Sequence, residues 1–235
     1  MTSVAGSTVL VTGGSRGIGR ALVESLCNRG ARKVYATARD PRSVTHPEAV
    51  PLPLEVTDPA SVAAAAERAR DVTILINNAG TTLRASLLTS PVDDIRHEFE
   101  TNFYGPLNMT RAFVPIIQAN GGGHLLNVHS VLSWIASPDL EAYSASKAAL
   151  WSQTNALRLE LRSRGINVTG LHVGCVDTDL SAHIDTPKTS PGSVAEQALD
   201  GIETDAYEVL ADDRSRQVKT GLAEGLATLY PELAG

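Results

Sequence analysis

Cysteine is scarce in this chain, with Cys27 and Cys175 the only two among 235 residues and no Cys-x-x-Cys motif. Two cysteines are too few for the disulfide framework that holds many small secreted domains together. We therefore interpret both as buried free thiols in a fold that depends on its apolar core.

Long apolar runs and basic tracts are missing as well. No apolar run approaches the length of a membrane span, so no membrane partner is expected. Acidic residues outnumber Lys and Arg by 26 to 20, and without a lysine-rich run nucleic acid is not an expected partner. A glycine-rich motif begins at Thr12 and leaves no room for a signal peptide before it, which predicts a cytoplasmic protein.

The apolar content is sufficient for a packed core, at 43% of residues. Apolar runs typical of strands cover Thr8–Val11, Lys33–Ala38, Leu52–Val56, Val72–Ile76, His124–Val128, Asn167–His172 and Tyr207–Leu210. Helical patterns cover Ile18–Arg29, Pro59–Arg70, Val92–Ala119, Ala142–Ser163, Ser193–Glu203 and Asp213–Leu229. This alternation predicts an α/β, Rossmann-type doubly wound fold: a mostly parallel seven-stranded sheet with helices on both faces. Without a linker or internal repeat, residues 1–235 are expected to form a single domain.

Three glycines follow the first predicted strand and open the first helix. Gly13, Gly17 and Gly19 have no side chains, so the backbone there can turn tightly and approach a pyrophosphate at the helix N-terminus. Their spacing, Gly-x-x-x-Gly-x-Gly, differs from the Gly-x-Gly-x-x-Gly of ordinary Rossmann dehydrogenases. A dinucleotide site is the favoured interpretation, and a plain strand-to-helix turn is the alternative.

The end of the second strand bears on the choice of cofactor. NAD sites usually place an acidic residue there, whereas this strand ends in Arg39, with Asp40 after it. Arg39, with Arg16 of the glycine turn, has the chemistry to pair with a 2′-phosphate. The pattern favours NADP(H) over NAD(H). The alternatives are that both arginines are solvated surface residues and that Asp40 reaches a ribose.

Tyr143 and Lys147 lie four residues apart in a predicted helix, so their side chains share one face. An ammonium beside a phenol favours the phenolate, and we therefore expect a lowered pKa for Tyr143. A nucleotide site and such a tyrosine in one chain indicate redox chemistry on an alcohol or a ketone.

The order and spacing of the motifs resemble the short-chain dehydrogenase/reductase superfamily over essentially the whole chain. The matching residues are Thr12 to Gly19, Asn77 to Gly80, Asn102, Ser130, Tyr143, Lys147 and Val173 to Thr178. The resemblance implies that Tyr143 is the general acid/base and that Lys147 lowers its pKa and holds the nicotinamide ribose. It also implies that Ser130 orients a substrate carbonyl and that Asn102 positions a water. Taken alone, Ser130 could be a turn residue at a strand end and Asn102 a satisfied buried amide.

The resemblance also assigns the cofactor contacts. They are Gly13, Ser15, Arg16, Gly17, Ile18, Gly19, Arg39, Glu55, Val56, Asn77, Asn78, Ala79, Gly80, Tyr143, Lys147, Val176 and Thr178, with no metal site. Glu55 replaces the family's usual Asp or Asn beside adenine, so its adenine contact is left open. Val173 replaces the usual proline and predicts a less rigid loop.

The substrate region is less clear from sequence. A short segment, Asp179 to Ser190, precedes the next helix and predicts a small or open lid. Residues that could line an apolar pocket, or equally belong to the core or the surface, are Trp134, Leu140, Leu180, His183 and Ile184. His129 is expected to point to the face opposite Ser130 and to be structural, because neighbouring strand residues alternate.

The predicted function is hydride transfer between NADP(H) and a ketone, an aldehyde or a secondary alcohol. The alternatives are a dehydratase or epimerase on the same scaffold, and a cofactor sensor or scaffold protein without turnover. Besides a small-molecule substrate, we expect a homodimer or homotetramer formed through the helices Val92–Ala119 and Ala142–Ser163. In that assembly Trp151 is either part of the interface or intramolecular core.

Overall fold

The computed structural model describes residues 2–233 and contains a seven-stranded sheet in the order β3-β2-β1-β4-β5-β6-β7. The strands are β1 (Thr8–Val11), β2 (Lys33–Ala38), β3 (Ala49–Pro53), β4 (Ile74–Asn77), β5 (Gly123–Val128), β6 (Ile166–His172) and β7 (Glu208–Leu210). Every neighbouring pair is parallel. The predicted fold class is confirmed, and the sheet is parallel throughout.

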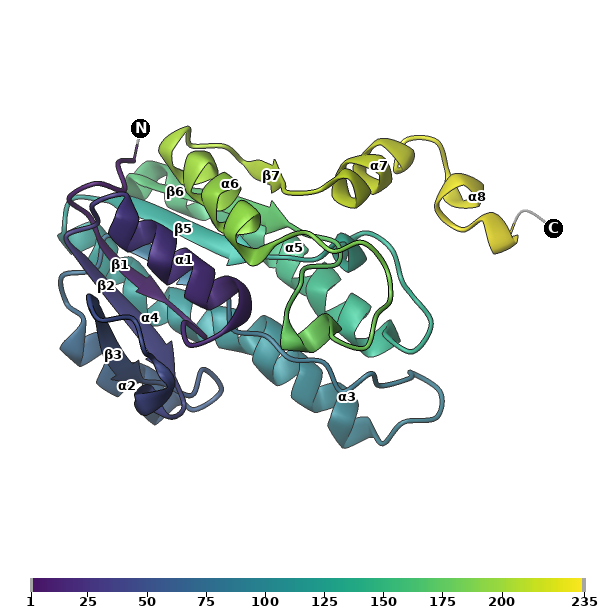
Figure 1. Cartoon of the computed structure of the whole chain (residues 1–235), viewed down its shortest axis with the longest axis horizontal. Coiled ribbons are helices and arrows are strands. Elements are labelled where there is room, and N and C mark those ends of the chain that lie inside the picture. The colour runs from purple at the N-terminus through teal and green to yellow at the C-terminus, as the bar shows by residue number, and fades with distance from the viewer. Residues whose placement is uncertain (1, 234–235) are drawn as a thin grey trace.

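Helices cover both faces of this sheet (Figure 1). One face packs on α1 (Gly17–Asn28) and α6 (Pro191–Glu203), and the other on α2 (Pro59–Arg68), α4 (Gly105–Ala119) and α5 (Glu141–Leu161). Side chains of a strand alternate between the two faces, so Val9 joins the first core while its neighbour Leu10 joins the second. Both cores are therefore continuous layers between sheet and helices.

The strand order reverses beside β1, whose two neighbours are β2 and β4. α1, which follows β1, and α4, which follows β4, lie on opposite faces of the sheet, which opens a crevice at the carboxyl ends of the strands. The glycine turn after β1 and the Asn78–Gly80 loop after β4 meet at this point. The topology therefore positions the predicted cofactor residues together.

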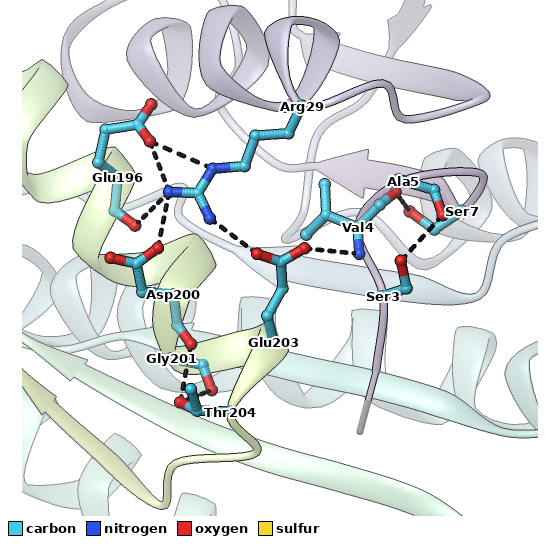
Figure 2. Close-up of polar contacts among 10 residues, drawn as sticks. All are labelled: Ser3, Val4, Ala5, Ser7, Arg29, Glu196, Asp200, Gly201, Glu203 and Thr204. Atoms are coloured by element: carbon cyan, nitrogen blue, oxygen red, sulfur yellow. Dashed lines mark hydrogen bonds and ion pairs between the residues drawn. The ribbon is translucent and has the colours of Figure 1, made fainter.

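A single arginine ties α1 to α6 (Figure 2). Arg29, at the end of α1, reaches Glu196 at 2.5 Å, Asp200 at 2.8 Å and Glu203 at 2.9 Å, all on α6. Glu203 also accepts a hydrogen bond from the backbone N–H of Val4. Burial opposes the charge of Arg29, but its hydrogen bonds to Glu196 and Asp200 raise its pKa overall. The contact fixes the helix that follows the glycine turn against the one that follows the predicted lid.

The third strand differs from its prediction, at Ala49–Pro53 rather than Leu52–Val56. The Glu55 carboxylate accepts hydrogen bonds from the N–H and the hydroxyl of Thr57, and this turn takes residues 55–57 out of the sheet. β3 pairs with β2 alone, and an edge strand tolerates prolines such as Pro51.

Two predicted helices are interrupted. The helix over 92–119 consists of α3 (Val92–Phe99), a π-helical turn (Glu100–Tyr104) and α4. The helix over 213–229 consists of α7 (Asp213–Gly221) and α8 (Leu226–Leu229), divided near Gly225, whose φ of 100° breaks the helix. Within residues 2–233, none of the helices combines the length and the apolar character needed to cross a bilayer.

Candidate active site and cofactor cleft

The turn between β1 and α1 has space for a ligand backbone and little for side chains. Gly13 adopts a φ of 66°, and a Cβ on Gly19 would lie 2.0 Å from the Gly13 carbonyl oxygen. The N-cap residue, Arg16, makes no side-chain capping bond, so it leaves the first N–H groups of α1 for another acceptor. This geometry fits the pyrophosphate of a dinucleotide.

The loop after β4 is fixed against this turn by Thr12. Its hydroxyl accepts hydrogen bonds at 2.9 Å from the backbone N–H groups of Asn78 and Ala79. The Asn78 amide donates in turn to the Thr12 carbonyl at 2.8 Å. Asn77 is the one predicted cofactor residue that does not line the cleft, since its amide donates to Asn127 beneath the loop.

The cleft brings together the other predicted cofactor residues. Its lining includes Gly13, Ser15, Arg16, Gly17, Ile18, Gly19, Arg39, Glu55, Val56, Asn78, Ala79, Gly80, Tyr143, Lys147, Val176 and Thr178. Sequence reasoning missed Thr37, Ala38, Leu54 and Thr57, which also line it. They flank the predicted residues at the ends of β2 and β3, so adjacency along the chain was the available signal.

The charges at the ribose end of the cleft are distributed unevenly. Asp40 is held by Arg42, at 2.9 Å, and caps the turn that follows, so it does not line the cleft. Arg39 does line it, and no ion pair is found for it among the described residues. Arg16 pairs with Asp179 across the cleft at 3.3 Å. The Arg16 side chain is 75% exposed and that of Asp179 is 78% exposed. Two guanidinium groups thus border this end of the cleft, and Arg39 is the one without an ion pair to an aspartate among the described residues.

Asn102 lies in the π-helical turn and is fully buried. Its carbonyl oxygen accepts from the Thr81 N–H, while its amide donates to the Thr81 carbonyl and to the Ser146 hydroxyl at 3.0 Å. A π-helical turn places one extra residue in a helix and is frequent at functional sites. Ser146 was missed, although it lies inside the Tyr143 to Lys147 motif.

Lys147 and Tyr143 project from one face of α5, as their spacing predicts, and both line the cleft. The ammonium of Lys147 donates to the Val128 carbonyl at 2.9 Å and lies 5.8 Å from the centre of the Tyr143 ring. Burial lowers the pKa of Lys147 to about 8. The pKa of this buried lysine therefore lies close to neutral pH.

The expected lowering of the Tyr143 pKa is wrong for the chain by itself. Burial raises the pKa of Tyr143 to about 12, hydrogen bonding to the Ser130 side chain opposes the rise, and the charge of Glu98 adds to it. Desolvation of the phenol therefore exceeds any help from Lys147, which hydrogen bonds to the backbone instead.

Glu98 is a second buried residue that sequence reasoning missed. It lies one helical turn before Asn102, and its Oε1 accepts hydrogen bonds from the Leu83 N–H at 2.6 Å and the Thr82 hydroxyl at 3.1 Å. Glu98 and Asn102 together fix three successive residues, 81–83, of which Thr81 and Thr82 line the cleft. No motif indicated this role for Glu98.

The predicted lid is short and closed at its base. The N–H of Asp177 donates to the Thr189 carbonyl, and the N–H of Thr189 donates to the Cys175 carbonyl. The predicted pocket residues Leu140, Leu180, His183 and Ile184 line the cleft, together with Leu132. Trp134 does not line it, because its ring stacks on His172 at 3.9 Å between centroids.

The imidazole of His129 is buried, as the structural interpretation predicts. It lies 4.8 Å from His172, ring centre to ring centre, and its Nε2 is 3.1 Å from the Thr154 hydroxyl. Trp151 is likewise engaged within the chain, where its indole N–H donates to Glu208.

Comparisons with known proteins agree with this geometry. The family model described as short chain dehydrogenase matches residues 7–189. The short-chain dehydrogenase ptmH of Penicillium ochrochloron is 39% identical over 181 residues, which are 73% of this chain and 66% of that protein. The 3-oxoacyl-[acyl-carrier-protein] reductase FabG of Salmonella typhimurium is 34% identical over 76% of this chain and 77% of its own.

A solved structure extends the likeness over nearly the whole chain. The short chain dehydrogenase from Burkholderia cenocepacia J2315, in complex with NADP, is 36% identical and covers 99% of both chains with a TM-score of 0.94. A Burkholderia phymatum protein of the same fold, in complex with NAD, is 22% identical with a TM-score of 0.84.

Proposed function

Because the chain belongs to the short chain dehydrogenase family, we propose that it is an oxidoreductase that transfers hydride between NADP(H) and a ketone, an aldehyde or a secondary alcohol. The observation that carries this proposal is the convergence of Ser130, Tyr143 and Lys147 on the cleft that contains the glycine turn. Asn102 supports them from the π-helical turn beside it.

Tyr143, Ser130 and Lys147 have separate roles in the proposed reaction. We assign the proton transfer with substrate oxygen to the Tyr143 hydroxyl and the orientation of that oxygen to Ser130. Lys147 would hold the nicotinamide ribose and contribute positive charge near the phenol. A bound nicotinamide supplies the hydride position, and its oxidised form adds the positive charge that favours the phenolate.

Arg39 supports NADP(H) over NAD(H). It borders the ribose end of the cleft with no ion pair to an aspartate, while Asp40 is engaged by Arg42. A guanidinium fits a 2′-phosphate through two parallel hydrogen bonds. The relative solved with NADP provides independent support.

The lining of the substrate end supports an uncharged carbonyl compound. Leu132, Leu140, Leu180 and Ile184 supply apolar surface to the cleft that Tyr143 also lines. Among residues 2–233, the lysine and arginine side chains that line the cleft are Lys147, Arg16 and Arg39, all given to the cofactor in this proposal.

Consumption of NADPH, followed by its absorbance with a panel of aliphatic and aromatic ketones, tests the function. We expect ketone-dependent consumption, slower when NADH replaces NADPH. Binding of NADPH without consumption by any ketone, and of NADP⁺ without reduction by any secondary alcohol, would instead indicate a binding protein without turnover.

We also propose that the protein is a homodimer or homotetramer that pairs the outer surfaces of α4 and α5. Leu159, on α5, is 84% exposed and suits such a contact, whereas Trp151 is engaged within its own chain. Light scattering should give a mass above that of one chain at micromolar concentration, and Leu159→Arg should lower it. A monomeric mass for the unaltered protein would contradict the proposal.

A further inference from the structure

A compact cluster of rings and charges lies behind the segment that carries Ser130. His172, at the end of β6, stacks on His129 at 4.8 Å and on Trp134 at 3.9 Å, measured between ring centres. His129 immediately precedes Ser130, and Trp134 closes the turn that follows it. The stacking on His172 therefore restrains the chain on both sides of Ser130.

Glu208, on β7, connects these rings to the C-terminal part of the chain. Its Oε1 lies 3.4 Å from Nε2 of His172 and accepts a hydrogen bond from the indole N–H of Trp151 at 3.2 Å. Its Oε2 pairs with the ammonium of Lys219, on α7, at 2.5 Å. One carboxylate thus holds side chains of β6, α5 and α7 together.

Lys219 closes the arrangement from the other side. Its ammonium lies 4.8 Å from the centre of the Trp134 ring and 5.9 Å from that of Trp151, within the range of a cation–π contact. Further along, the hydroxyl of Tyr230 accepts a hydrogen bond at 2.7 Å from the backbone N–H of Ala136. The chain beyond β7 is therefore anchored to the turn that starts at Ser130.

Of these described residues His129 lines the cleft and the others lie behind it, and all of them surround one catalytic segment. Within its own turn, Ser130 donates its N–H to the Ser133 hydroxyl and accepts from the Leu132 N–H. Outside the turn its side chain hydrogen bonds to Tyr143, and its backbone hydrogen bonds to His172. Its direction toward Tyr143 depends on how that turn is held.

We propose that His172 and Glu208 are positioning residues that hold Ser130 in place for carbonyl orientation, with Lys219 of α7 completing the support. The proposal rests on the proposed function. A displacement of about 1 Å at a reacting group can cost about 100-fold in rate, so partial loosening of the turn should be visible in turnover.

Glu208→Gln is the primary variant, because the amide keeps the size and an acceptor for Trp151 while removing the charge that faces His172 and Lys219. We expect kcat for ketone reduction to fall about 10-fold. NADPH affinity, measured by nucleotide fluorescence, should stay within about 2-fold, because the glycine turn lies at the other strands. Lys219→Met, at a partly exposed position, should act in the same direction and guards against misfolding of the first variant.

The Ser130→Ala background separates positioning from general damage. If Glu208 acts through Ser130, Glu208→Gln should lower kcat by no more than about 2-fold once the hydroxyl is gone. An equal fold-loss of kcat in both backgrounds would overturn the proposal.

The chain offers a matched control in Asp71→Asn. The Asp71 carboxylate pairs with the Lys33 ammonium at 2.6 Å, and that ammonium lies 5.3 Å from the centre of the Tyr35 ring. Lys33 and Tyr35 lie on β2, away from Ser130. The control should leave kcat unchanged. A loss of kcat equal to that of Glu208→Gln would overturn the proposal.

Tryptophan fluorescence gives a readout that does not require turnover. Trp134 and Trp151 are the two tryptophans of the sequence and both lie in the cluster, so Glu208→Gln and Lys219→Met should each change the emission. An altered emission with unaltered kcat would overturn the positioning role. If the unaltered protein differs in tryptophan emission from both variants but reduces no ketone, that result would instead contradict the proposed function.

Discussion

The two ends of the cleft are constructed by different means. At the end formed by β1, β2 and β4, backbone atoms determine the geometry: glycines leave space, and Thr12 and Asn78 bond to neighbouring main-chain groups. Behind the end formed by the loops after β5 and β6, side chains support the chain through rings and charges from elements far apart in the sequence. A backbone cradle suits a ligand common to a family, whereas a support of side chains varies more readily from one protein to another.

The largest effect should come from removing the proton donor at the side-chain end. Tyr143→Phe keeps the ring and removes the hydroxyl, so ketone reduction should fall by at least about 100-fold. NADPH binding, measured by fluorescence on the same preparation, should survive. Folded variant protein that binds NADPH and retains near-native turnover would rule out Tyr143 as the acid.

The pH dependence of alcohol oxidation also tests whether Tyr143 transfers the proton. Burial raises the pKa of Tyr143 to about 12 in the chain by itself, so the phenolate is scarce at neutral pH. Positive charge from Lys147 and oxidised nicotinamide should offset this, and oxidation should rise with pH through an apparent pKa below that of free tyrosine, near 10. A rise that occurs only above pH 10 would show that burial still dominates.

At the backbone end, Arg39→Asp should change the choice of cofactor. The variant loses a charge-assisted contact with a 2′-phosphate and adds a repelling carboxylate, so kcat/KM with NADPH should fall by about 100-fold. Its kcat/KM with NADH should fall less or rise. Arg42→Asp makes the same change of charge three residues away, outside the cleft, and should leave the NADPH preference largely intact. Equal kcat/KM with both cofactors in the unaltered protein would contradict the NADP assignment.

This contrast also determines what the sequence could predict. The fold, the glycine turn and the Tyr143–Lys147 pair follow from local spacing, because strand alternation and helical periodicity are local properties. The π-helical turn around Asn102 leaves no trace in that periodicity, since hydrophobic residues continue on both sides of it. The cluster around His172 could not be predicted, because its members come from β6, β7, α5, α7 and the segment after β5 and meet only in the folded chain.

A smaller effect, on stability, should come from the contact between α1 and α6 (Figure 2). Arg29 is 21% exposed and neutralises three carboxylates, so Arg29→Met leaves these carboxylates close together without a counter-charge. The free energy of unfolding should fall by about 2 kcal/mol. Arg20→Met on the same helix breaks one exposed pair with Glu24 and should cost less than about 0.5 kcal/mol. Urea unfolding of both variants at neutral pH measures the difference, and equal losses would show that the shared contact adds nothing.

The smallest effect should be an increase, not a decrease, in the free energy of unfolding. The pKa of Lys147 is lowered by burial to about 8, below its unfolded value of 10.5, so the charged form is disfavoured in the fold. The resulting penalty on stability is fully present below pH 8 and disappears as the pH rises toward 10.5. Lys147→Met removes the penalty and also the hydrogen bond to the Val128 carbonyl, which leaves a net gain of about 1 kcal/mol at pH 7.

Lys33→Met, in the other half of the sheet, provides the comparison. Lys33 has a raised pKa because it hydrogen bonds to Asp71, so the same substitution there should destabilise the protein at pH 7. Urea unfolding of the two variants at pH 7 and pH 10 measures both signs. The Lys147→Met gain should shrink at the higher pH, while turnover is lost at either pH because the lysine is part of the site. A variant at Lys147 that is equally destabilised at both pH values would mean that the ammonium contributes more through its hydrogen bond than its burial costs, and that this residue stabilises the fold as Lys33 does.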